Sequence, residues 1–326
     1  MNDVLLDIQD LRTYFHVRGG VAKAVDGVSL QLRRGETLGL VGESGCGKTV
    51  TSLSILKLLD VPPAEYRGGR IVFEGQNLLE VGEKEMRKVR GKRISMIFQE
   101  PMTSLNPLMS IGAQIQEMLV KHEQVGWSKA RQMSIELLSQ VGIPAPRRRI
   151  DERPHQLSGG MRQRVMIAMA LACSPTILIA DEPTTALDVT IQAQILDLMR
   201  RLQTDLGTSI LLITHDLGVI AETADFVAVM YAGRIVEQAD VKTIFKNPLH
   251  PYTQGLLRSI PRVDEATGPE RLREIPGQVP DLSCLPPGCS FFDRCPIGDD
   301  GCRQGEVELR TVETGHAVAC RKAWVD

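Results

Sequence analysis

The sixteen residues from Leu38 to Leu53, LGLVGESGCGKTVTSL, constrain the fold more than any other segment of this chain. They match the pattern G-x-x-x-x-G-K-[ST], in which a glycine-rich loop joins a strand to a helix. In such a loop successive backbone N–H groups point inward at phosphate oxygens, and the helix N-terminus adds its positive dipole end. The pattern therefore predicts a nucleotide-phosphate site formed by Gly42, Glu43, Ser44, Gly45, Cys46, Gly47, Lys48, Thr49 and Val50.

Two side chains of this loop carry the expected chemistry. Lys48 is long enough to reach the β- and γ-phosphates, and the hydroxyl of Thr49 is a suitable ligand for Mg²⁺. Cys46 is interpreted as a small residue that fits the loop, and not as a redox group. The loop thus predicts a nucleoside triphosphate bound together with Mg²⁺.

A second constraint lies in QLSGGMRQRVMIAMALACSPTILIADE, residues 156–182. Ser158, Gly159 and Gly160 open a helical pattern, so that a positive helix end faces an anion. The apolar run that follows predicts a buried strand that ends in Asp181 and Glu182. In a protein with a phosphate loop, the first carboxylate suits Mg²⁺ and the second is placed to take a proton from water.

Together these motifs resemble the nucleotide-binding subunits of ATP-binding-cassette (ABC) transporters, over residues 4–255. The resemblance implies an α/β phosphate-loop cassette with an antiparallel β subdomain and a helical subdomain at about residues 100–165, all within a domain of residues 1–255. It also assigns three further site residues. Gln99 in ISMIFQEP is the Q-loop glutamine, His215 in LLITHD is the switch histidine, and Phe15 stacks on adenine, with Tyr14 as the alternative.

The resemblance further implies how ATP is used. Two cassettes dock head to tail, so Ser158, Gly159 and Gly160 contact the γ-phosphate in the partner's site. Mg²⁺ is held by Thr49, Gln99 and Asp181; Glu182 polarises the attacking water; and His215 holds the γ-phosphate. The implied partners are two transmembrane permease subunits, a paralogous ATP-binding subunit or a second copy of the chain, and an extracytoplasmic substrate-binding protein.

The C-terminal residues 256–326 are expected to form a small, irregular extension. Five of the seven cysteines lie in the last 43 residues, and the segment IPGQVPDLSCLPPGCSFFDRCP resembles the tail of oligopeptide and dipeptide importers. The resemblance assigns a [4Fe–4S] cluster, found in some members, to Cys289, Cys295, Cys302 and Cys320. The spacing C-x5-C-x6-C-x17-C lacks the paired C-x2-C of zinc ribbons, so Zn²⁺ ranks second and metal-free thiols or disulfides rank third. Cys284 is interpreted as a bystander.

Composition narrows the classes of function. The net charge of −2 and the pI of about 6.3 disfavour a nucleic-acid-binding protein. The N-terminal MNDVLLDIQD has no basic region typical of a signal peptide, and no apolar run approaches the ~18 residues of a membrane span. These observations favour a cytoplasmic protein, and the resemblance implies a peripheral protein on the cytoplasmic face of the inner membrane, the ATPase of a peptide importer. The alternatives are a soluble ABC ATPase of DNA repair or translation, or an importer of nickel, glutathione or oligosaccharides.

Overall fold

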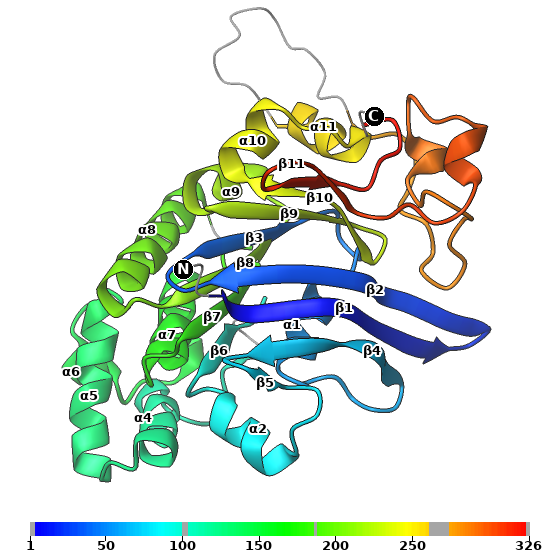
Figure 1. The fold of residues 1–326 in the computed structure, drawn as a ribbon. Coiled ribbons are helices and arrows are strands. Elements are labelled where there is room, and N and C mark those ends of the chain that lie inside the picture. The colour runs from blue at the N-terminus through cyan, green and yellow to red at the C-terminus, as the bar shows by residue number, and fades with distance from the viewer. Residues whose placement is uncertain (1–3, 100–103, 186–187, 261–273, 324–326) are drawn as a thin grey trace, which may run out of the picture. The chain divides into compact units, whose positions relative to one another are not determined.

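The computed structural model describes residues 4–99, 104–185, 188–260 and 274–323. The chain forms two compact units, one of Met1–Leu79 with Ile213–Asp326 and one of Glu80–Leu212. Each unit combines strands with helices, as Figure 1 shows, which confirms the predicted α/β class. No described helix is long and apolar enough to cross a membrane.

The first unit contains an antiparallel four-stranded sheet in the order β2-β1-β4-β5 (Figure 1). Its strands are β1 (Val4–Val17), β2 (Gly20–Arg33), β4 (Ala64–Phe73) and β5 (Gln76–Asn77). From Asp26 to Leu32 every second residue of β2 is buried, which is the period expected when one face of a strand packs on a core. The sheet confirms the predicted antiparallel β subdomain.

The same unit holds strands in the order β11-β12-β10-β9-β3 (Figure 1). They are β3 (Thr37–Val41), β9 (Phe226–Tyr231), β10 (Arg234–Asp240), β11 (Arg310–Glu313) and β12 (His316–Val318). All five residues of β3 are buried, and β3 runs parallel to β9. Because β12 pairs with β10, the end of the chain adds its strands to the edge of this sheet.

The remaining elements of the first unit are helices and short 3₁₀ turns. The helices are α1 (Lys48–Ile55), α9 (Leu217–Thr223), α10 (Val241–Lys246) and α11 (Pro251–Arg258), and the turns are η2 (Phe292–Arg294) and η3 (Asp300–Arg303). Residues 274–290 contain neither helix nor strand, in agreement with their content of proline and glycine. The predicted domain boundary at residue 255 stays a prediction.

The second unit is mainly helical around three strands in the order β8-β7-β6. The strands are β6 (Ile94–Ile97), β7 (Ile177–Asp181) and β8 (Ser209–Thr214), whose last residues belong to the first unit. The helical elements are α2 (Glu83–Val89), α4 (Ile111–Glu123), α5 (Trp127–Gln140), α6 (Pro146–Arg149), the turn η1 (Pro154–Gln156), α7 (Gly159–Leu171) and α8 (Val189–Leu206). Helices α4 and α5 fall within the helical subdomain predicted at about residues 100–165, of which residues 100–103 lie outside the described residues.

Candidate functional site

The phosphate loop follows the buried strand β3 and ends where α1 begins at Lys48. Two of its glycines are required by geometry. Gly42 and Gly47 have φ values of 156° and 110°, and a Cβ at either would lie 2.2 Å from a backbone oxygen, of Met230 and Ala24 respectively. Only glycine fits such a close approach, so the loop can adopt the tight wrap expected of a phosphate-binding turn.

Lys48 lies within the concave side of this loop. Its Nζ donates to the carbonyl oxygens of Gly42 at 2.7 Å and Glu43 at 3.0 Å, and its side chain is largely buried. Cys46 is fully buried beside it, and burial raises the pKa of the Cys46 thiol. A neutral thiol at this position agrees with the interpretation of Cys46 as a small packing residue. Ser44, Gly45 and Thr49 are exposed and accessible to a ligand.

Two predicted site residues meet at one edge of the second unit. Strands β6 and β7 are parallel, so Gln99 and Glu182 both follow strand ends at the same edge. Gln99 Nε2 donates to Glu182 Oε2 at 3.0 Å, and Thr185 Oγ1 donates to the same oxygen at 2.9 Å. Asp181, the last residue of β7, is almost fully buried. The paired acids are therefore in different environments.

Glu182 also has an uncommon backbone conformation, with a φ of 47°. A residue with a Cβ in the left-handed region costs about 1–3 kcal/mol, and such residues gather at functional sites. The strand end thus turns sharply at Glu182 and leaves its carboxylate partly exposed. Seven other non-glycine residues of the described chain also have a positive φ, so the role of Glu182 as the group that takes a proton from water stays a prediction.

The remaining predicted residues lie at element ends. Ser158 is the N-cap of α7, where its side chain accepts from Met161 N at 3.4 Å, and Ser158 and Gly159 are exposed. Gly160 is half-buried. His215 follows β8 and is exposed. Each can therefore be reached by a ligand, as its predicted role requires.

Of the two aromatic candidates for adenine, Phe15 is the better placed. Phe15 lies in β1 and is half-buried, and no polar partner restrains its ring. Tyr14 donates its hydroxyl to Asp26 at 2.6 Å, and Arg234 also donates to Asp26. Tyr14 therefore belongs to a polar cluster of the first unit, which favours Phe15 for stacking.

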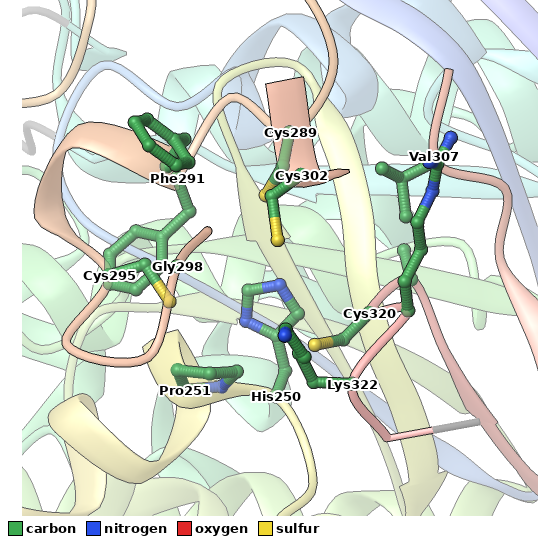
Figure 2. A pocket seen from close by; sticks show the side chains of 13 residues that line it. His250, Pro251, Cys289, Phe291, Cys295, Gly298, Cys302, Val307, Cys320 and Lys322 are labelled. Atoms are coloured by element: carbon green, nitrogen blue, oxygen red, sulfur yellow. The ribbon is translucent and has the colours of Figure 1, made fainter. Parts of the chain in front are cut away.

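The four cysteines assigned to a cluster line a single cavity. Figure 2 shows Cys289, Cys295, Cys302 and Cys320 around this cavity with His250 beside them. Cys284 is exposed and is not among the residues that line the cavity. The four predicted thiols therefore share one cavity, and Cys284 lies outside it.

The arrangement of these thiols is not that of a mononuclear metal site. Within the described ranges, no group of three or more His, Cys, Asp or Glu side chains could hold a metal ion. The cavity measures about 20 Å³, room for about one water-sized group, so a cluster would require the thiols to separate. Burial raises the pKa of Cys289 to about 11 and also raises those of Cys295 and Cys320. The metal prediction for the tail is not confirmed by this geometry.

One contact near the phosphate loop was not predicted from the sequence. Arg294 of η2 forms a two-pronged ion pair with Glu43 of the loop, at 2.7 and 2.9 Å. Tyr252 of α11 accepts a hydrogen bond from the Glu43 N–H at 2.8 Å. These residues are separated by more than two hundred positions. The one signal in the sequence that could have indicated a role for Arg294 is its position next to the clustered cysteines.

Comparison with known proteins agrees with this geometry. The family model for the ABC transporter matches residues 25–185. The family model for the oligopeptide/dipeptide transporter C-terminal region matches residues 236–302. The fold and the phosphate loop define a P-loop ATPase of the cassette type. The chain belongs to the ABC transporter ATP-binding proteins, and within them to those that carry the oligopeptide/dipeptide C-terminal region.

Two peptide transport proteins match most of the length of this chain. The oligopeptide transport ATP-binding protein OppD of Bacillus subtilis is 57% identical over 88% of this chain and 80% of its own length. The dipeptide transport ATP-binding protein DppD of Bacillus subtilis is 54% identical over 90% of this chain and 87% of its own length. Among solved structures, the dimeric cassette MJ0796 bound to ADP and Pi is 25% identical, covers 72% of this chain and 98% of that one, and has a TM-score of 0.66.

Proposed function

We propose that this protein is the ATP-hydrolysing subunit of an importer of oligopeptides or dipeptides. The observation that carries the proposal is the oligopeptide/dipeptide C-terminal region at residues 236–302, in a chain more than half identical to OppD and DppD. The subunit works with two transmembrane permease subunits and dimerises with a paralogous ATPase or with its own copy. A binding protein outside the membrane delivers the peptide, and this chain is attached to the cytoplasmic face of the inner membrane.

The proposed division of labour starts with charge neutralisation, because phosphoryl transfer to water depends on positioning and electrostatics. Lys48 and the loop N–H groups bind the phosphates, and Phe15 stacks on adenine. Mg²⁺ is held by Thr49, Gln99 and Asp181. Oxygen donors of this kind are the ligands that Mg²⁺ prefers.

Hydrolysis itself is assigned to Glu182, which polarises the attacking water, and to His215, which holds the γ-phosphate. The hydrogen bonds from Gln99 and Thr185 fix the orientation of the Glu182 carboxylate. Ser158 and the two glycines after it contact the nucleotide of the partner cassette. The exposed N-terminus of α7 supports this role, since it can be approached by a second molecule.

The transport function is tested by tagging this chain and purifying the complex that it forms in the membrane of its own cell. We expect two permease subunits at stoichiometric amounts, and ATP turnover of the reconstituted complex that rises several-fold with binding protein and peptide. Nickel, glutathione and oligosaccharides, tested under the same conditions, should leave turnover at its basal rate. Recovery with DNA or ribosomes in place of membrane subunits would contradict the importer and support a soluble ATPase.

The proposal also places a [4Fe–4S] cluster on Cys289, Cys295, Cys302 and Cys320, with Zn²⁺ as the alternative. Its support is the set of four thiols on one cavity and the resemblance of the tail to importers that carry such clusters. When bound, the cluster would supply a covalent staple to a tail that contains little regular structure of its own. The ion pair of Arg294 and the pairing of β12 with β10 hold the tail independently of it.

Metal analysis of the full chain purified without oxygen tests this assignment. We expect about four iron atoms and four sulfides per chain, as a four-thiolate cluster requires. Cys302→Ser should lose most of the iron, whereas the matched control Cys284→Ser, outside the cavity, should retain it. Stoichiometric zinc without sulfide would replace the cluster by a zinc site, and the absence of both would overturn the metal assignment.

A further inference from the structure

The C-terminal tail places a buried arginine on the phosphate loop. The guanidinium of Arg294 donates through Nη1 to Glu43 Oε2 at 2.7 Å and through Nη2 to Glu43 Oε1 at 2.9 Å. The side chain of Arg294 is 5% exposed, and that of Glu43 is 31% exposed. A two-pronged pair of this kind fixes orientation as well as charge, because both planar groups must align.

Arg294 is also held by groups other than Glu43. Its Nε donates to Pro276 O at 2.9 Å, its Nη2 to Ile275 O at 3.3 Å and its Nη1 to Tyr231 OH at 3.4 Å. The guanidinium is therefore anchored by the tail and by β9 even without the carboxylate. Substituting Glu43 should leave a positive charge at the same place.

Glu43 is restrained through its main chain as well. Its N–H donates to the hydroxyl of Tyr252, and its carbonyl oxygen accepts from Lys48 Nζ at 3.0 Å. The Tyr252 ring packs against Tyr231 and Phe291, with ring centres 4.7 and 5.4 Å apart. The side chain and the N–H of Glu43 are thus held by the tail and α11, and its carbonyl oxygen is held by Lys48.

The carboxylate of Glu43 poses an electrostatic problem for the loop that carries it. A phosphate loop binds a polyanion, and a second negative charge within it would oppose that binding over several ångströms, most strongly where solvent is excluded. Lys48 Nζ donates to the main-chain oxygens of Gly42 and Glu43 in the structure, and its expected role is to bind the phosphates. Arg294 is the cation that pairs with this carboxylate in the structure.

We propose that Arg294 is a positioning residue for ATP binding, which neutralises Glu43 and fixes the phosphate loop from the C-terminal tail. The inference rests on nucleotide binding at the loop and not on the proposed peptide substrate. It gives the tail a direct part in the nucleotide site. Since Cys295 follows Arg294 and lines the cysteine cavity, the turn η2 connects that cavity to the loop.

Four variants of the full chain test whether Arg294 acts by neutralising the charge of Glu43 or only by holding the loop in place. We measure the dissociation constant of Mg·ATP at low salt. Arg294→Met should weaken binding about tenfold, and Glu43→Gln should tighten it about threefold, because each leaves one charge of the pair uncompensated. The double variant should recover most of the affinity lost in Arg294→Met. Arg294→Lys, which keeps the charge but not the two-pronged geometry, should lose no more than about threefold.

A matched control and a salt series complete the test. Arg310→Met removes an exposed arginine of the same tail, paired with the exposed Glu308, and should leave the affinity unchanged. The deficit of Arg294→Met should shrink as ionic strength rises, since Glu43 is partly exposed to solvent.

The proposal is overturned if Arg294→Met binds ATP like the original chain, or if Glu43→Gln weakens binding and the double variant recovers nothing. Those results would make the pair a structural brace. Should Arg294→Met fail to fold by circular dichroism, the sign of the Glu43→Gln effect decides alone. A chain that binds no ATP in its original form would instead refute the ATPase assignment, so the two failures are distinguishable.

Discussion

Glu182→Gln is expected to abolish most ATP turnover while leaving ATP binding intact. The carboxylate can take a proton from the attacking water, and an amide of the same size cannot, so the loss should be about 100-fold or more in kcat. The amide oxygen of the new side chain can still accept from Gln99 and Thr185, which now donate to Glu182. The local structure at the end of β7 should therefore be preserved. The measurement is kcat of the assembled transporter alongside the dissociation constant for ATP.

Glu136→Gln serves as the control for this prediction. Glu136 lies on the surface of α5 in the same unit and accepts a hydrogen bond from Gln132, so the same chemical change occurs away from the site. Its kcat should match that of the original chain. Unchanged turnover in Glu182→Gln would remove Glu182 from the role of base and leave His215 as the remaining candidate for the proton acceptor.

Much of the site could be predicted because its residues occur at ends of regular elements. The phosphate loop lies between an apolar strand and a helix, and parallel strands place Gln99 and Glu182 at one edge. Such positions follow from patterns of a few residues, because strand period and loop chemistry are local properties. The positive φ of Glu182 could not be predicted from the sequence, because no local pattern requires it.

In the C-terminal tail, by contrast, the most important contacts could not be predicted from the sequence. The resemblance of the tail to those of peptide importers grouped four of its cysteines, and the structure places these four on one cavity with Cys284 outside it. The contact of Arg294 with Glu43 could not be predicted, because it joins residues 251 positions apart through a segment without periodicity. Tyr252, whose hydroxyl accepts from the loop, was hidden for the same reason. Long-range polar contacts are selected by tertiary packing, which leaves little trace in one sequence.

Gly47→Ala should cost the protein both its nucleotide site and part of its stability. Gly47 has a φ of 110°, where side chains other than hydrogen are strained, and its Cβ would lie 2.2 Å from Ala24 O and 2.6 Å from Met230 Cε. The backbone oxygen cannot turn away as a side chain could, so the loop itself must move. The expected loss in the free energy of unfolding is about 3 kcal/mol, typical of a strained backbone combined with a steric clash.

The same movement displaces the groups that follow Gly47. Gly47 is the N-cap of α1, and its carbonyl oxygen accepts from Thr51 N at 2.9 Å, so a shift at this residue reorients the first turn that carries Lys48. ATP binding should fall by about 100-fold or more, because several charge-assisted hydrogen bonds to phosphate are lost together. Isothermal titration with Mg·ATP and chemical denaturation of the full chain measure the two effects.

Gly35→Ala separates the clash from the strain of a positive φ. Gly35 has a φ of 72° in the turn before β3, and nothing lies within 4 Å of its Cβ position. Its substitution should cost about 1 kcal/mol from the left-handed backbone alone and leave ATP affinity unchanged. If Gly47→Ala costs no more than Gly35→Ala and binds ATP normally, the loop tolerates a Cβ at residue 47. The close approach to Ala24 then does not set the shape of the phosphate site.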